Sequence, residues 1–133
     1  IDGIEFINDS KATNPAAATA DLEAMDRPFV AIVGGKDKGA DFAKLGALLT
    51  ERARAVILIG EAAERIARTL GDVPHQRAGT LEEAVAVAAR LAKAGDVVIM
   101  APACSSFDMF RDYAHRGHVF QQAVRHLAGE AER

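Results

Sequence analysis

The chain has 133 residues, of which 50% are hydrophobic and 26% charged, and its formal net charge at pH 7 is -3. This length suits one domain with a single hydrophobic core. The small charge, without a basic stripe, argues against nucleic acid or an anionic membrane surface as a partner, and no apolar run approaches the roughly 20 residues that span a bilayer. A single cysteine and no recognisable secretion signal indicate a cytoplasmic protein that binds small molecules.

The first half of the chain is predicted to contain three strands and two helices. A strand over 3–8 leads through a polar loop to a helix that Asn14 can cap and Pro15 can begin, because the first helical position tolerates a missing N–H group. This helix is expected to run to about residue 25. The β-branched content of the next two apolar runs favours strands. The remaining elements of this half are strands over 29–34 and 55–59, with a helix over 42–53 between them.

The second half continues the alternation of helix and strand. A helix over 62–70 and a weaker strand over 76–78 come first. Thr80 and Glu83 have the spacing of a capping box, and an apolar face then recurs at helical spacing until Gly95 ends the helix. A strand over 97–101, a short helix after it and a last helix over 117–128 complete the chain. The sequence therefore predicts an α/β, Rossmann-like single domain over 1–133, with a mostly parallel sheet covered by helices on both faces.

In such sheets ligands bind outside the carboxyl ends of the strands, where loops lead into helices. Three loops meet this condition and have the most unusual composition in the chain. We call residues 9–14 the first loop, 34–41 the second loop and 102–108 the third loop.

The first loop places polar side chains between a strand and a helix N-terminus, which attracts anions. Lys11 and Thr13 could add one positive charge and one hydroxyl donor. The alternative is that Asp9, Ser10 and Asn14 are only turn and cap residues. Capping accounts for Asn14, but it does not account for Lys11.

The second loop combines glycines, which let the backbone approach a ligand, with Lys36 and Lys38. It is not a nucleotide-binding P-loop, because no Gly-Lys-Ser/Thr follows a glycine at the required spacing anywhere in the chain. The sequence thus predicts an anion-binding loop without the usual machinery for ATP. A solvated loop of lysines is the alternative.

The third loop follows an apolar strand, and Ser105, Ser106 or Asp108 could cap a short helix there. Six residues separate Cys104 from Arg111, one more than a cysteine phosphatase has between its thiolate and its arginine. Cysteine phosphatase chemistry is therefore disfavoured. The nearby histidines match no familiar zinc spacing, so no metal site is predicted, and the start of the last helix is expected to lie in solvent.

Three strings in these loops, NDSKATN, GGKDKGADF and PACSSFD, resemble the C-terminal domain of the Mur ligases. The resemblance covers essentially the whole chain. Within this family the string DSKATN is typical of the members that add D-glutamate to UDP-N-acetylmuramoyl-L-alanine in peptidoglycan synthesis. The resemblance implies a reaction in which ATP and Mg²⁺ activate the alanine carboxylate as an acyl phosphate, which the amine of D-glutamate attacks.

The family's N-terminal UDP-binding domain and central ATP-binding domain have no counterpart in these 133 residues. The resemblance implies that those domains hold the UDP-sugar, most of the ATP and the magnesium ion. The chain by itself is therefore expected to be inactive. A stand-alone anion-binding α/β module is the alternative function.

The resemblance also implies roles for single residues. D-Glutamate is expected to place one carboxylate on Thr13 and Lys38, and the other on Ser106 and backbone N–H groups near Phe107 and Tyr113.

Two residues of the first loop are expected to face the missing domain. Asp9 matches the position that touches the ATP ribose, and Lys11 matches the catalytic position that reaches toward the phosphates. The sequence leaves open whether Lys36 or Lys38 points into the amino-acid site.

Overall fold

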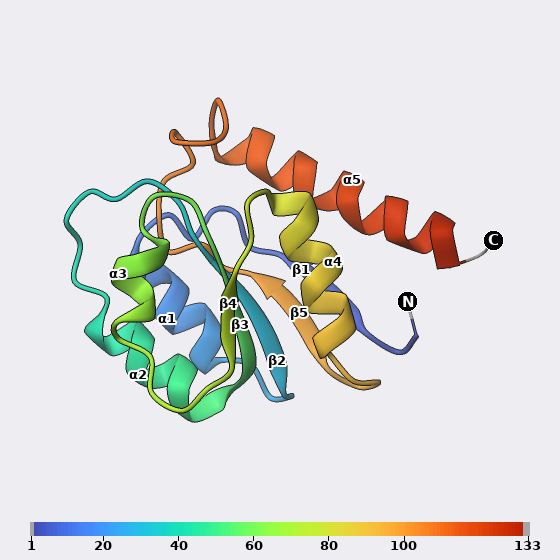
Figure 1. The fold of residues 1–133 in the computed structure, drawn as a ribbon, viewed down its shortest axis with the longest axis horizontal. Helices are drawn as coiled ribbons and strands as arrows, with labels where there is room; N and C mark the ends of the chain where they lie inside the picture. Colours follow the sequence, from blue (N-terminus) through green and yellow to red (C-terminus); the bar gives the residue numbers. More distant parts are fainter. Residues whose placement is uncertain (1, 132–133) are drawn as a thin grey trace.

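A computed structural model describes residues 2–131 of the chain (Figure 1). Its centre is a five-stranded sheet in which all neighbouring strands are parallel, in the order β1-β5-β2-β3-β4. The strands are β1 (Glu5–Asn8), β2 (Phe29–Gly34), β3 (Ala53–Ile59), β4 (His75–Arg77) and β5 (Val97–Met100). All five predicted strands are confirmed, with ends that differ by no more than two residues.

The helices cover both faces of the sheet, as predicted. One face carries α1 (Pro15–Glu23), α2 (Ala43–Arg52) and α3 (Ala63–Ala67), and the other carries α4 (Leu81–Leu91) and α5 (Tyr113–Ala131). Leu22 and Leu45 fill the first core layer, and Leu81 and Phe120 fill the second. β2 is buried along its whole length because it lies between these layers.

Several helix predictions need correction, including that for α3, which ends at Ala67 instead of residue 70. The short helix expected in the third loop is a series of turns, and the last helix begins at Tyr113, four residues before the predicted start. The Asp112 carboxylate accepts a hydrogen bond from the His115 N–H group (2.8 Å), so Asp112 supplies the cap instead of the three candidates in the loop. Residue Ala53, predicted to end a helix, begins β3.

The order of the strands positions the three loops. β5 lies between β1 and β2, so the loops that follow these strands leave the sheet side by side, at the upper edge of Figure 1. Within residues 2–131, none of the helices combines the length and apolar character that a membrane crossing requires.

Candidate functional site

The first loop is fixed by hydrogen bonds to the strands and to α5. The Asp9 N–H group donates to the Met100 carbonyl of β5 (2.9 Å). The Ser10 hydroxyl donates to the Tyr113 carbonyl (2.7 Å), and Asn14 caps α1 by accepting from the Ala17 N–H group. Ser10 and Asn14 therefore have the turn and cap roles that composition suggested. Lys11, in contrast, projects into solvent.

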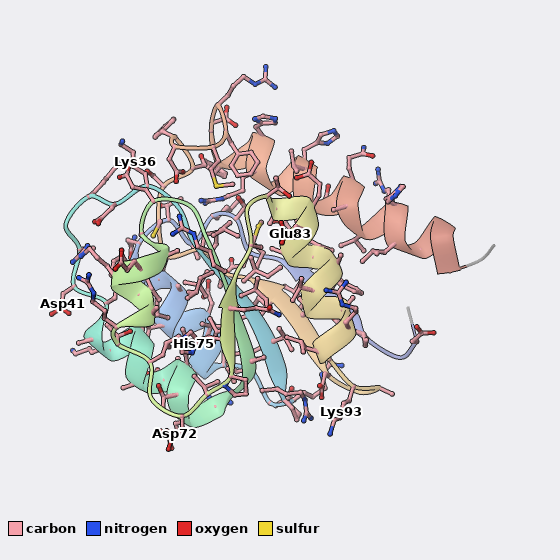
Figure 2. The ribbon with its side chains drawn as sticks, viewed as in Figure 1. Lys36, Asp41, Asp72, His75, Glu83 and Lys93 are labelled. Atoms are coloured by element: carbon pink, nitrogen blue, oxygen red, sulfur yellow. The ribbon has the colours of Figure 1, made fainter. Side chains whose placement is uncertain are left out.

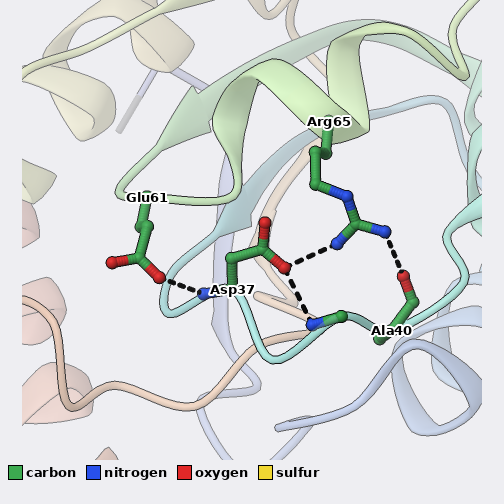
Figure 3. Close-up of polar contacts among 5 residues, drawn as sticks. Asp37, Ala40, Glu61 and Arg65 are labelled. Carbon is green, nitrogen blue, oxygen red and sulfur yellow. Dashed lines mark hydrogen bonds and ion pairs between the residues drawn. The ribbon is translucent and has the colours of Figure 1, made fainter.

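The second loop is held by two charged side chains of the segment that follows β3 (Figure 3). The Arg65 guanidinium donates to Asp37 Oδ1 (2.5 Å) and to the Ala40 carbonyl (2.7 Å), and Glu61 Oε1 accepts from the Asp37 N–H group (3.0 Å). Asp37 Oδ1 also accepts from the Gly39 N–H group (2.9 Å). These bonds bracket Lys38 on both sides, so the loop is not the freely solvated segment that its lysines suggested.

The third loop bonds directly to the second. Lys36 and Ser105 form an isolated antiparallel bridge, in which the Lys36 N–H group donates to the Ser105 carbonyl (3.0 Å). A Cβ atom on Gly35 would lie 2.6 Å from this carbonyl, so only glycine fits beside it. Ala103 has φ 64°, a left-handed value that is uncommon for a residue other than glycine.

A hollow of about 110 Å³ lies where the three loops meet. Thr13, Lys36, Lys38 and Ser105 line it together with apolar side chains. The Lys38 ammonium is 5.9 Å from the centre of the Phe107 ring. We call this space the lysine hollow. Both candidate lysines line it, so the structure does not single out Lys38.

A second hollow of about 290 Å³ lies on the other side of the first loop, against the start of α5. Its lining includes Asp9, Ser10, Lys11 and Tyr113, and we call it the Asp9 hollow. Thr13 and Lys38 thus line one hollow, and Asp9 and Lys11 line the other. The family resemblance groups Tyr113 with the amino-acid site, but Tyr113 lies in the Asp9 hollow.

Ser106 is buried next to the lysine hollow, without being among its lining residues. Its carbonyl accepts from the Met109 and Phe110 N–H groups (3.1 and 2.8 Å). Phe107 is 62% exposed, so its ring is open to contact from outside the domain.

Asp9 of the first loop and Cys104 of the third loop both have raised pKa values. Burial, followed by the hydrogen bond and the charge of Asp21, raises the pKa of Asp9 to about 7. Burial raises the pKa of the Cys104 thiol to about 12, so the thiol is neutral at pH 7 and is no nucleophile. This agrees with the argument from spacing against a cysteine phosphatase.

Arg116 of α5 was missed, because the sequence suggested that this end of the helix is solvated. It is instead only 1% exposed. Its guanidinium donates to the Ser10 hydroxyl (2.9 Å), the Ser10 carbonyl (2.7 Å) and the Cys104 carbonyl (2.8 Å). Burial lowers its pKa to about 10, which still leaves it charged at pH 7. Gly117, where a side chain would collide with Asn8, was the one available signal of close packing here.

The neighbouring His115 and His118 do not form a metal site with Cys104 and Asp108. Among residues 2–131, no group of three His, Cys, Asp or Glu side chains lies close enough to hold a metal ion.

Comparison with known proteins agrees with the three loop strings. Residues 1–104 match the family model described as Mur ligase, glutamate ligase domain. The chain is 52% identical over 130 residues to the UDP-N-acetylmuramoylalanine-D-glutamate ligase of Geotalea daltonii, and 51% identical over 132 residues to that of Geobacter metallireducens. The matches cover 97% and 98% of the chain but only 29% of each of these relatives.

Two solved structures share the fold. A domain described as part of a UDP-N-acetylmuramate:L-alanyl-gamma-D-glutamyl-meso-diaminopimelate ligase from Haemophilus ducreyi superposes with a TM-score of 0.59 at 19% identity, covering 77% of this chain and 82% of that one. The bifunctional folylpolyglutamate synthase/dihydrofolate synthase of Yersinia pestis superposes with a TM-score of 0.58 at 24% identity, covering 83% of this chain and 26% of that one. On the family match and the identity to these relatives, the chain belongs to the Mur ligase family and has its glutamate ligase domain.

Proposed function

We propose that this chain binds D-glutamate as the C-terminal domain of a three-domain ligase that adds it to UDP-N-acetylmuramoyl-L-alanine. The observation that carries the proposal is the convergence of Thr13, Lys36 and Lys38 on one hollow at the carboxyl edge of the sheet. A dicarboxylic amino acid needs cations and hydroxyl donors of this kind, and each charge-assisted hydrogen bond contributes about 1.5 to 3 kcal/mol. D-Glutamate is chosen as the ligand because the similar proteins of Geotalea daltonii and Geobacter metallireducens are named as D-glutamate ligases.

The proposed reaction also requires a free amine. ATP phosphorylates the alanine carboxylate, which releases ADP; the D-glutamate amine then attacks the carbonyl carbon of the acyl phosphate, and phosphate leaves as the amide forms. The amine must therefore be positioned without being held by an ion pair. No carboxylate is present among the described residues that line the lysine hollow, so no acidic side chain of this lining would pair with the substrate amine.

The second substrate carboxylate is proposed to bind the Ser106 hydroxyl and backbone N–H groups near Phe107 and Tyr113. This placement rests on the family resemblance and on the position of Ser106 directly after Ser105, a lining residue of the lysine hollow.

The Asp9 hollow is proposed to receive part of the ATP. Asp9 Oδ2 is buried and has no hydrogen-bond partner among the described residues, which suits an acceptor for a ribose hydroxyl. Lys11 is exposed beside it and could stabilise charge that develops on the phosphates. By the family resemblance, Mg²⁺ and most of the ATP are assigned to a central domain, and the isolated chain is expected to be inactive. The proposed reaction uses cytoplasmic substrates.

Binding to the chain itself tests the amino-acid site. D-Glutamate should shift the amide NMR signals of Thr13, Lys38 and Ser106, and Lys38→Ala or Thr13→Ala should weaken the shifts. Lys93→Ala is the matched control, because Figure 2 places Lys93 at the opposite edge of the sheet from Lys36. Shifts confined to that opposite edge would contradict the placement.

Activity of the full-length protein tests the reaction. Lys38→Ala should raise the KM for D-glutamate about tenfold or more and leave the KM for ATP nearly unchanged, because a charge-assisted bond is lost only from the amino-acid site. Lys11→Ala should lower kcat. D-Glutamate-dependent release of ADP is the assay. If the wild-type protein releases no ADP with D-glutamate, a stand-alone anion-binding module becomes the better interpretation.

A further inference from the structure

Ser105 has a buried hydroxyl group that the fold does not use. Its oxygen is one of three buried side-chain polar atoms without a hydrogen-bond partner in residues 2–131, and the other two belong to the carboxylates of Asp9 and Asp108. The residue is 8% exposed. An unpaired hydroxyl of this kind lowers stability, so its presence calls for an explanation.

The backbone around Ser105 is held firmly, although its side chain is not. Its carbonyl accepts from Lys36, the preceding Cys104 carbonyl accepts from Arg116, and the Ala103 N–H group donates to Ala12 (2.9 Å). The backbone that carries the hydroxyl is therefore fixed by bonds to the first loop, the second loop and α5, and only the side-chain rotamer of Ser105 is free. A donor held in place in this way is well suited to bind a ligand, because little conformational freedom is lost on binding.

The chemistry around the hydroxyl indicates the ligand. Ser105 lines the lysine hollow with Thr13, Lys36 and Lys38. A cation would be repelled there, and a purely apolar ligand would leave the ammonium and hydroxyl groups unsatisfied. A carboxylate has enough lone pairs to accept from a lysine and a hydroxyl at the same time.

We propose that the Ser105 hydroxyl donates a hydrogen bond to a carboxylate of the bound acidic amino acid, and is a specificity-determining residue beside Ser106. The proposal rests on the proposed function, because D-glutamate is the ligand it assigns. Ser105 is a lining residue of the hollow, whereas Ser106 is buried and is not among the lining residues. The sequence suggests both serines as helix caps, and neither caps a helix.

The substitution Ser105→Ala is a clean test. The substitution removes the hydroxyl oxygen without breaking a hydrogen bond of this segment, because the bonds that fix the segment are made by the backbone or by Arg116. Removal of an unpaired buried hydroxyl should leave the melting temperature unchanged or raise it. A loss of substrate affinity without a loss of stability is a result that a merely structural role of Ser105 does not produce.

The experiment measures steady-state kinetics of the full-length protein with D-glutamate and ATP varied separately. Ser105→Ala is expected to raise the KM for D-glutamate about tenfold, with less than a twofold change in the KM for ATP and no fall in the melting temperature. Thr19→Ala is the matched control. Its hydroxyl donates to the Pro15 carbonyl inside α1 and does not line the lysine hollow, so both KM values should stay as in the wild type.

Two results separate the inference from the proposed function. If the wild type uses D-glutamate and Ser105→Ala leaves its KM within twofold, the inference is overturned and the proposed function stands. The inference is likewise overturned if Ser106→Ala raises the KM for D-glutamate and Ser105→Ala does not. If the wild type does not use D-glutamate, the proposed function fails and this inference fails with it.

Discussion

The guanidinium of Arg65, on α3, binds the Asp37 carboxylate at 2.5 Å and thereby joins a helix to a loop 28 residues away in the sequence. The same guanidinium donates to the Ala40 carbonyl and lies 5.1 Å from the centre of the Phe42 ring. Hydrogen bonding from the Gly39 N–H group, followed by that from Arg65, holds the pKa of Asp37 below its usual value. Arg65 therefore fixes the loop that carries Lys38 without touching the lysine hollow.

Arg65→Ala is expected to raise the KM for D-glutamate about threefold to tenfold, because Lys38 must then be ordered by the substrate. The melting temperature should fall only slightly, since Arg65 is half-exposed. Arg68→Ala, just after the same short helix, is the control. Its ion pair with Glu64 lies on the surface, so its loss should leave the KM unchanged. Equal effects of the two substitutions would contradict a positioning role for Arg65.

Arg116→Lys should lower the free energy of unfolding by about 2 kcal/mol or more. A single ammonium group cannot reproduce the three directed hydrogen bonds to Ser10 and Cys104, and a buried carbonyl left without a donor is costly. Urea unfolding of the chain measures the change. Arg125→Lys, at an exposed position of the same helix, should have almost no effect. A stable Arg116→Lys variant would show that packing, not hydrogen bonding, holds the loops.

The raised pKa of Asp9 predicts a pH dependence of stability. Because the folded protein holds this proton more tightly than the unfolded chain, the stabilisation is complete below pH 3.8 and is lost as the pH rises through about 7. Asp9→Asn should remove this component, and thermal unfolding between pH 4 and pH 8 measures it. The exposed Asp26→Asn is the control. An Asp9 carboxyl that titrates near its ordinary value in NMR would contradict the prediction.

Substitution of Asp96 should lower the stability of the domain without affecting the proposed amino-acid site. At the opposite edge of the sheet, its carboxylate accepts from Arg54 (2.5 and 3.1 Å) and from the Lys93 N–H group (2.8 Å). The Arg54 bond lowers the pKa of Asp96, so this stabilisation is present above the pKa of the unfolded chain and is lost as the pH falls through the lower folded value. Asp96→Asn should lower the melting temperature by about 4 °C or more at pH 7 and leave the KM for D-glutamate unchanged. Asp72→Asn, on the surface in Figure 2, should change neither.

The sequence alone determined the elements of this protein, and it also predicted the edge of the sheet at which a ligand binds. Apolar runs with β-branched residues formed strands where they were predicted, because such residues favour the extended backbone and are stabilised by burial between two helix layers. The Asn14 and Thr80 caps were also predictable, since a cap depends on residues within one turn. The glycines, lysines and hydroxyl residues of the three loops predicted an anion site at that edge, because each of these residue types favours a bound anion wherever the loop is accessible.

Only the tertiary structure decided which side chains share a hollow. Strand order depends on pairing between residues far apart in the chain, and it placed the third loop between the first and the second. The burial of Arg116 and the attachment of Arg65 to the second loop follow from that arrangement, and apart from Gly117 no local pattern in the sequence indicates them. The place of Ser105 beside the second loop depends in turn on the backbone bond from Lys36. Local propensity carries no information about such contacts, because they form only when distant segments pack together.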